Sequence, residues 1–438
     1  MKTILIPKNT RYQPLRSVLI AVFTLVFVGA GAAMLLLATG CQKLAEERVA
    51  LAGLPPGIDA SGFIRNDVGW PDVYEDPQKI DYEITMNAVI EDNVMVRIAP
   101  GVIIKFTGTN SGITVSNGAL VAVGTEAKPI CLDGSVESRG SWLGIRFNTD
   151  NPANEMQHCK VRWGGSDGFG AVQVRGALGG IYRSFCKITF CEIANSSNYG
   201  LYTDKNADIV FAENALTNNG NAPARITTLQ LGKLDAASNY SNNAFGHIEV
   251  AGEGDIDSSS IDVPKLIVPY MVQSGSINIG AGNLTILPGV EMRFKPNTRI
   301  VVLVAGGGTL TAIGEPGNRI TFRGVQAGRG GWDGIAIFGA SIANRFEYCT
   351  IDGGGQTPMG ALTQGGAGRA NIVVGNTQIN FPAAYFENCT IGNSAGYGIW
   401  VGGNSASGIN GGTLNPDILE PALNNLFPNN ASANIGPF

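Results

Sequence analysis

Short runs of apolar residues, separated by glycine, asparagine, aspartate or proline, dominate the chain beyond residue 80. Typical runs lie at 102–106, 119–123, 130–132 and 143–147; they are rich in Val, Ile and Phe and partly alternate with polar positions. This spacing is typical of short β-strands between turns, because strand side chains alternate between two faces. No later segment has a convincing helical period. The pattern therefore predicts an all-β protein.

The shortness of these runs distinguishes between two all-β architectures. A sandwich or barrel needs longer strands and many tight hairpins, whereas a solenoid stacks short strands in successive coils. Asparagine also recurs at the turns, where it tolerates a left-handed backbone and can stack from coil to coil. The positions are Asn195, Asn214, Asn218, Asn219, Asn388 and Asn393. These features favour the solenoid.

One pattern of residues occurs twice in the chain. Pro100-Gly101-Val102 recurs as Pro288-Gly289-Val290, and Trp142-Leu143-Gly144-Ile145 recurs as Trp332-Asp333-Gly334-Ile335. Further pairs in the same order are Tyr82 with Tyr270, Phe106 with Phe294, Asn154 with Asn344, Cys159 with Cys349, and Cys191 with Cys389. Internal repetition on this scale indicates a duplicated module. We expect module one at 79–264 and module two at 265–438, preceded by a leading segment at 41–78.

A family resemblance rests on four stretches of module one. Residues 89–106, 118–130, 140–145 and 158–165 include the series Pro-Gly-Val-Ile-Ile-Lys-Phe, Gly-Ala-Leu-Val-Ala-Val-Gly and Gly-Ser-Trp-Leu-Gly-Ile. They resemble right-handed parallel β-helix proteins of the pectate-lyase-like superfamily, in the branch common among bacterial surface proteins. The resemblance covers most of both modules. It implies a right-handed parallel β-helix and no particular activity.

The first forty residues have the composition of a secretory signal. Four basic residues precede an uncharged run at 18–39; they are Lys2, Lys8, Arg11 and Arg16. A basic start, an apolar middle and small residues at the boundary are typical of a signal peptide. The boundary at 38–41 resembles the lipobox of bacterial lipoproteins, which implies cleavage after Gly40 and lipidation of Cys41. The alternative is an uncleaved transmembrane anchor, since the run is long enough to span a bilayer.

Removal of residues 1–40 would leave a clearly acidic chain. It would carry 26 basic and 35 acidic residues, a net charge of −9. Nucleic acid and anionic lipid surfaces both require a basic patch, so neither is expected as a partner. Acyl chains on Cys41 would instead hold the protein to a membrane. By the same lipoprotein resemblance, Gln42 favours the outer membrane, with the protein facing the periplasm or the cell surface.

Residue types that support catalysis or metal binding are present but scattered. The resembled superfamily includes polysaccharide lyases and hydrolases, and glycoside hydrolysis needs two carboxylates about 5–10 Å apart. Asp333 and Asp352 are candidate acids, but their counterparts in module one are not acidic. His158 and His247 have no paired spacing, and the acidic residues at 253–257 fit either a Ca²⁺ site or an inter-module loop. We expect no metal, no cofactor and no catalytic residue.

Six cysteines lie beyond Cys41, at positions 131, 159, 186, 191, 349 and 389. The pairs Cys159/Cys349 and Cys191/Cys389 occupy equivalent strand positions beside apolar residues. A small apolar side chain suits the interior of a coil, so we expect free, buried thiols. An oxidising compartment would permit disulfides. Cys186 with Cys191 is then the local pair to test.

Aromatic residues are the candidates for ligand contact. Trp142 and Trp332 are equivalent, as are Tyr199 and Tyr397, whereas Trp163 and Trp400 have no counterparts. Exposed rings along a β-helix face can stack on sugar rings. Buried rings at the same positions would instead be a packing device that was copied with the module.

The functional hypothesis is a lipid-anchored, non-catalytic β-helix protein of the cell envelope, acting in adhesion or in glycan or matrix binding. One alternative is a polysaccharide-active lyase or glycoside hydrolase, which grouped Asp, Arg or Lys side chains in one cleft would favour. Another is a purely structural module of a larger envelope complex.

Overall fold

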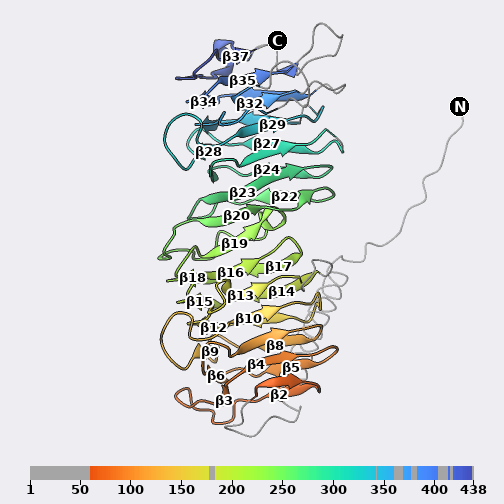
Figure 1. Cartoon of the computed structure of the whole chain (residues 1–438), viewed down its shortest axis with the longest axis vertical. Helices are drawn as coiled ribbons and strands as arrows, with labels where there is room; N and C mark the ends of the chain where they lie inside the picture. Colours follow the sequence, from red (N-terminus) through yellow and green to blue (C-terminus); the bar gives the residue numbers. More distant parts are fainter. Residues whose placement is uncertain are drawn as a thin grey trace, which may run out of the picture. The chain divides into compact units, whose positions relative to one another are not determined.

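A computed structural model describes residues 60–176, 183–304, 306–341, 343–359, 368–375, 382–402, 413–414 and 418–436. Its regular structure is almost entirely β-strand, and every pairing between strands is parallel. Successive strands form coils that stack one on the next (Figure 1). The prediction of a right-handed parallel β-helix is confirmed.

Each coil of the first half contributes one strand to each of three sheets, here named A, B and C. Sheet A holds β2 (Val68–Trp70), β5 (Met95–Ile98), β8 (Ala119–Val123), β11 (Glu155–Gln157), β14 (Ser184–Thr189) and β17 (Ala207–Ala212). Sheet B holds β3 (Tyr82–Ile84), β6 (Ile103–Phe106), β9 (Ile130–Gly134), β12 (Cys159–Arg162), β15 (Glu192–Ala194) and β18 (Ala215–Thr217).

Sheet C continues from the first half of the chain into the second. It holds β1 (Gly62–Ile64), β4 (Asn87–Ile90), β7 (Gly112–Val115), β10 (Ile145–Phe147), β13 (Gly170–Val174), β16 (Tyr199–Thr203), β19 (Ala224–Thr227) and β20 (Ile248–Gly252). It then holds the first part of β23 (Tyr270–Ile279), β25 (Glu291–Phe294), β28 (Ile320–Gly324), β31 (Cys349–Asp352) and β34 (Thr390–Gly392). Parallel pairing already begins at β1, before the expected start of module one at residue 79.

Two further sheets, D and E, complete the coils of the second half. Sheet D holds β21 (Asp255–Ile256), the second part of β23, β26 (Arg299–Val302), β29 (Gly334–Ile337), β32 (Ala370–Val374), β35 (Tyr397–Val401) and β37 (Ile435–Gly436). Sheet E holds β22 (Ser260–Val263), β24 (Asn283–Ile286), β27 (Thr309–Ile313), β30 (Arg345–Glu347), β33 (Ala383–Glu387) and β36 (Thr413–Leu414). Two short 3₁₀ turns, η1 (Thr228–Gln230) and η2 (Pro421–Leu423), complete the regular structure.

Alternation within the strands builds the core. In β5, Val96 and Ile98 are buried, whereas Met95 and Arg97 lie on the outer face. Most strands follow this rule, so stacked coils place one buried side chain above another throughout the described part of the solenoid. The outward positions are thereby left free to vary.

Equivalent strands of the two modules belong to successive sheets and not to the same sheet, an offset that we call the phase shift. Phe106 lies in sheet B, but its counterpart Phe294 lies in sheet C; Ile145 lies in sheet C, but its counterpart Ile335 lies in sheet D. Pairing continues through the junction in sheet C, from β19 to β20, β23 and β25, with a register shift in the β20–β23 pair between Val250 and Ala251. Equivalent positions of the two modules therefore belong to different faces of one continuous solenoid.

The repeated tryptophans form the same interior contact in both modules. The ring of Trp142 stacks on Phe106 at 3.9 Å, and that of Trp332 stacks on Phe294 at 4.2 Å. Each indole Nε1–H donates to a backbone carbonyl of a later strand, Arg162 at 2.7 Å and Asp352 at 2.8 Å. The duplicated motif therefore preserves a packing unit.

Asparagines act at the corners in two ways. Asn195, Asn218, Asn388 and Asn393 adopt the left-handed backbone that the sequence predicted for them. Asn214 and Asn219 instead link coils: Asn219 Oδ1 accepts from Ser196 N at 3.0 Å, and its Nδ2 donates to Ile193 O at 3.2 Å. Each such side chain satisfies two backbone groups that a corner would otherwise leave unpaired.

The prediction of free thiols is confirmed for all six described cysteines, and five of them are buried. Cys159 and Cys191 are hydrogen-bonded neighbours on adjacent coils, as are Cys349 and Cys389. Burial raises the pKa of the Cys159, Cys186 and Cys349 thiols well above the ordinary value. Because the thiolate is the reactive form, these thiols are both covered and chemically passive.

We therefore expect a disulfide-exchange reagent to label the native chain at Cys131 first among these six, although burial and the Asp133 carboxylate raise the pKa of this thiol as well. Cys131 is the one of the six that is partly exposed. Peptide mass spectrometry would locate the label, and denaturation should release all six thiols. Rapid labelling of native Cys159 or Cys349 would contradict this expectation.

The expected signal peptide, the Gly40 cleavage point and the Cys41 lipidation site lie outside the described residues, as does the first part of the leading segment. Within the described part of the chain, no helix is both long and apolar enough to cross a bilayer.

Candidate functional site: the outer face of sheet C

Four of the six aromatic residues predicted as ligand contacts are buried, which corrects that prediction. Trp142 and Trp332 have no exposed surface, because each is sandwiched in the interior against phenylalanine. Trp400 is 5% exposed, packed with Ala336 and Val373, and Tyr199 is 9% exposed. Neither tryptophan of the repeated motif can stack on a sugar.

The two remaining candidates are partly exposed but do not form a platform. Trp163 follows β12 of sheet B and packs against the main core, whereas Tyr397 begins β35 of sheet D and packs against the small cluster around Trp400. They thus belong to different modules and different sheets. The residues proposed from the sequence are not brought together.

Another set of side chains is brought together, on the outer face of sheet C in module one. Strand register aligns Arg146 of β10, Gln173 of β13, Tyr202 of β16 and Arg225 of β19 in one row. Residues in register on neighbouring parallel strands lie about 4.8 Å apart, so their side chains contact each other directly. We call this row and the residues bonded to it the arginine–aromatic face.

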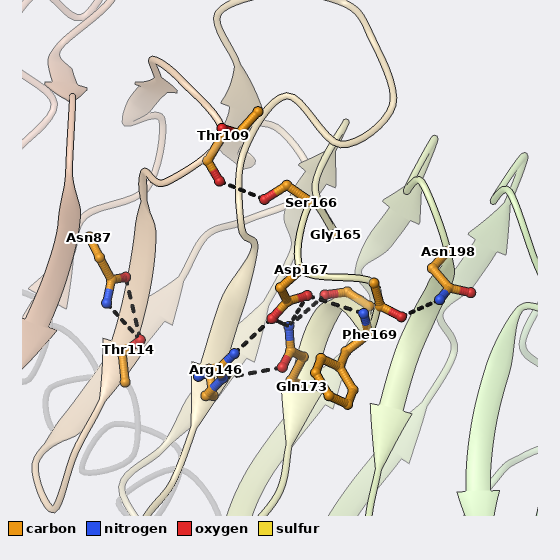
Figure 2. Close-up of polar contacts among 12 residues, drawn as sticks. Asn87, Thr109, Thr114, Arg146, Gly165, Ser166, Asp167, Phe169, Gln173 and Asn198 are labelled. Atoms are coloured by element: carbon orange, nitrogen blue, oxygen red, sulfur yellow. Dashed lines mark hydrogen bonds and ion pairs between the residues drawn. The ribbon is translucent and has the colours of Figure 1, made fainter.

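Asp167, in the turn before β13, is the centre of the polar network (Figure 2). Its carboxylate accepts from Arg146 Nη2 at 2.7 Å and from Gln173 Nε2 at 2.9 Å. It also accepts from the backbone N–H of Phe169 at 3.1 Å, which fixes the turn that presents the Phe169 ring. Arg146 Nε donates to Gln173 Oε1 at 3.2 Å, so the network is closed on itself.

Aromatic rings and guanidinium groups alternate beside this network. The Arg175 guanidinium lies 4.1 Å from the centre of the Phe169 ring, and that of Arg225 lies 4.7 Å from the centre of the Tyr202 ring. Phe169 meets Tyr202 edge-on at 4.9 Å. Such cation–π and edge-to-face contacts fix the orientation of side chains that are only half buried.

Arg175 differs from the other two arginines of the face. Arg146 pairs with Asp167, and Arg225 pairs with Glu253 at 3.0 Å. Among the described residues, Arg175 has no ion pair. Burial lowers its pKa from the ordinary value, and the charge of Arg146 lowers it further. It stays protonated at neutral pH, so it is the arginine of the face whose charge is not paired within the described residues.

The two tyrosines keep their hydroxyl protons. Burial raises the pKa of Tyr199 and Tyr202 above the ordinary value, and the carboxylate of Glu249 adds to the effect at Tyr199, whose hydroxyl it hydrogen-bonds. Both phenols are therefore hydrogen-bonding groups and not bases. The partly exposed donors of the face are guanidinium groups and the Tyr202 phenol, next to the Phe169 ring, whereas the Gln173 amide is buried and bonded to Asp167 and to the Gly170 carbonyl.

In module two the equivalent outward positions are buried. Arg146 corresponds to Ala336, Gln173 to Val373 and Tyr202 to Trp400, and these three residues form an apolar cluster. The coil therefore does not require polar residues here. The interior contacts recur in both copies, whereas the outward positions differ in chemistry between them.

The candidate acids and metal ligands lie elsewhere and do not converge. Asp333 is fully buried and pairs with Arg299 at 2.7 Å, whereas Asp352 accepts from Asn393 at 2.7 Å. Asp255 accepts from the Asn278 side chain. Within the described ranges, no group of three His, Cys, Asp or Glu side chains could hold a metal ion.

Sequence reasoning missed the arginine–aromatic face because its residues are joined by coil register. Arg146 and Gln173 are 27 positions apart, and Asp167 comes from a turn. One signal was available. At matched positions of the two modules, apolar residues replace Arg146 and Gln173, although the flanking inward residues agree.

Comparisons with protein-family profiles, curated proteins and solved structures found no match. The fold alone defines the class, a right-handed parallel β-helix protein.

Proposed function

We propose that this protein is a lipid-anchored component of the bacterial cell envelope that binds glycans through the arginine–aromatic face. The observation that carries the proposal is the pair of partly exposed guanidinium groups, Arg146 and Arg175, beside the Phe169 ring, with Arg146 held in place by Asp167 and the buried Gln173. Sugar hydroxyls pair well with such planar bidentate groups, and aromatic rings pack against sugar C–H surfaces. The lipobox-like residues before Cys41 support the anchor.

Binding fits this network better than catalysis does. Both oxygens of Asp167 accept hydrogen bonds from residues of the face, so the carboxylate acts as a fixed acceptor. A general acid or base needs a proton site that is open to the substrate. Fixed polar groups also lower the ordering cost of binding, which is the benefit of a rigid solenoid.

The test is a glycan-array screen of the full-length protein in detergent, followed by affinity measurement on the best ligand. We expect Arg175→Ala to weaken binding about tenfold, equivalent to about 1.4 kcal/mol, because it removes donors that no carboxylate of the face satisfies. Its fold should persist, since the Arg175 side chain has no ion pair among the described residues.

The matched control is Lys187→Ala, which removes a cation from the outer face of sheet A, where Lys187 pairs with Glu155 at 3.0 Å. It should bind as the unaltered protein does. Equal loss in both variants, or no loss in Arg175→Ala, would refute the site. Release of reducing ends or unsaturated products from the bound glycan would replace the binding proposal with a catalytic one.

A further inference from the structure

A second cluster of charged side chains lies on the same sheet, in module two. Arg293 of β25 and Arg323 of β28 are in register, and both contact Glu291. Glu291 accepts from Arg293 Nε at 2.8 Å, from Arg293 Nη2 at 3.3 Å and from Arg323 Nε at 2.8 Å. One carboxylate therefore serves two guanidinium groups.

The cluster has unpaired hydrogen-bond donors and keeps a net positive charge even when Asp352 is counted, which lies next to Arg323 in register and accepts from Asn393. Neither Nη atom of Arg323 has an acceptor among the described residues. The same holds for the ammonium group of Lys295, which directly follows β25. Burial lowers the pKa of His247, and the nearby charges of Arg293 and Lys295 lower it further, so the local potential is positive. The two arginines also lower the pKa of Glu291 against the opposing effect of burial.

The corresponding cluster of module one differs in its acid. There Asp133 is almost completely buried and binds both Arg162, at 2.7 Å, and Lys105, at 3.4 Å. The Glu291 side chain is 31% exposed, whereas Arg293 and Arg323, at 30% and 37%, are about as exposed as Lys105 and Arg162, at 26% and 32%. The cations of module two thus reach solvent beside an acid that is not enclosed, on a chain that is acidic overall.

The phase shift between the modules places this cluster in line with the arginine–aromatic face. Register leads from Arg225 through Glu249 and Met271 to Arg293. Three steps of about 4.8 Å separate the two arginines, a span of roughly 14 Å along the stack. Without the shift, Arg293 and Arg323 would lie in sheet B, as their counterparts in module one do, and would not be in line with the arginine–aromatic face.

We infer that the ligand is an acidic glycan whose chain lies along sheet C and places a carboxylate or sulfate group on Arg293, Arg323 and Lys295. This inference rests on the proposed glycan-binding function and adds the charge of the ligand and a second contact region. A guanidinium group can form two parallel hydrogen bonds with a carboxylate or a sulfate. Because Arg293 and Arg323 share one carboxylate, an added anion would supply the counter-charge that the second guanidinium group lacks.

The test uses full-length protein and three immobilised probes: polygalacturonate, dextran sulfate and uncharged dextran. We expect both acidic probes to bind, and Arg323→Gln to weaken their binding about tenfold, with a weaker dependence on salt because one screened charge contact is lost. Lys295→Gln, which breaks no ion pair with any described residue, should weaken binding about threefold to fivefold and guards against an effect of misfolding. Whichever acidic probe binds more tightly identifies the anion.

Arg345→Gln is the matched control, because Arg345 is similarly exposed and pairs with Glu347 on sheet E. It should leave binding unchanged. Wild-type affinity in both Arg323→Gln and Lys295→Gln, or equal binding of uncharged dextran, overturns the inference. If Arg175→Ala still weakens binding in that case, the proposed function stands without it; if no glycan binds at all, both fall.

Discussion

Trp142→Ala is expected to destabilise the solenoid by about 3–5 kcal/mol, the range for removing a large, fully buried aromatic side chain. The indole is completely covered, stacks on Phe106 at 3.9 Å and donates to the Arg162 carbonyl. The substitution removes apolar burial, an aromatic stack and a satisfied hydrogen bond in one step. Surrounding coils cannot collapse into the space, because their backbones are fixed by pairing on both sides. A shift in the urea midpoint with an unchanged slope would measure the effect.

Two comparisons make this expectation specific. Trp332→Ala should cost the same to within about 1 kcal/mol, since its ring stacks on Phe294 in the same way. Trp163→Ala should cost less, about 1–2 kcal/mol, because Trp163 is only partly buried. If Trp142→Ala were as mild as Trp163→Ala, the repeated motif would not be the packing unit that the geometry indicates. Unfolding in two steps would show that the modules respond separately.

The fold was predictable because its determinants are local and repeated. Runs such as Ala119–Val123, bounded by glycine, specify short strands, and the corner asparagines specify where each coil turns. Because the module occurs twice, the pattern of short strands and corners appears twice in the sequence. The thiols were predictable for the same reason, since Cys159 and Cys349 occupy matched inward positions.

The site was not predictable because register, and not sequence order, brings its residues together. The aromatic residues most visible in the sequence, Trp142 and Trp332, were conspicuous because packing had preserved them in both modules. Repetition within a chain marks what the scaffold needs. Binding residues are better sought where the copies disagree, as Arg146 and Ala336 do.

The phase shift between modules was likewise hidden from the sequence. Alignment of the two copies shows that they are related, but it carries no information on which sheet each copy joins. That choice is made at the junction, where η1 interrupts sheet A and β23 turns from sheet C into sheet D. One sheet thereby runs the length of the described solenoid and presents a row of outward positions from both modules.

Asp133→Ala is expected to cost about 2–3 kcal/mol, somewhat less than the 3–5 typical of breaking a fully buried pair, because Arg162 keeps partial access to water. Asp133 is 4% exposed and binds Arg162 through both carboxylate oxygens, at 2.8 and 2.7 Å, and this contact raises the pKa of Arg162. Removal of the acid takes the shared ion-pair partner from two neighbouring cations, since Lys105 also pairs with Asp133.

The double variant Asp133→Leu, Arg162→Met separates the destabilisation caused by an unpaired charge from the net contribution of the ion pair to the free energy of unfolding. Because desolvation offsets much of a buried ion pair, the double variant should recover most of the loss and fall within about 1 kcal/mol of the unaltered protein. Glu155→Ala, which breaks the more exposed pair with Lys187 on sheet A, should cost less than about 1 kcal/mol. Urea denaturation of the four proteins decides between the outcomes. If the double variant were as unstable as Asp133→Ala, the ion pair itself would stabilise these coils, and the loss in Asp133→Ala would not come from the unpaired cations.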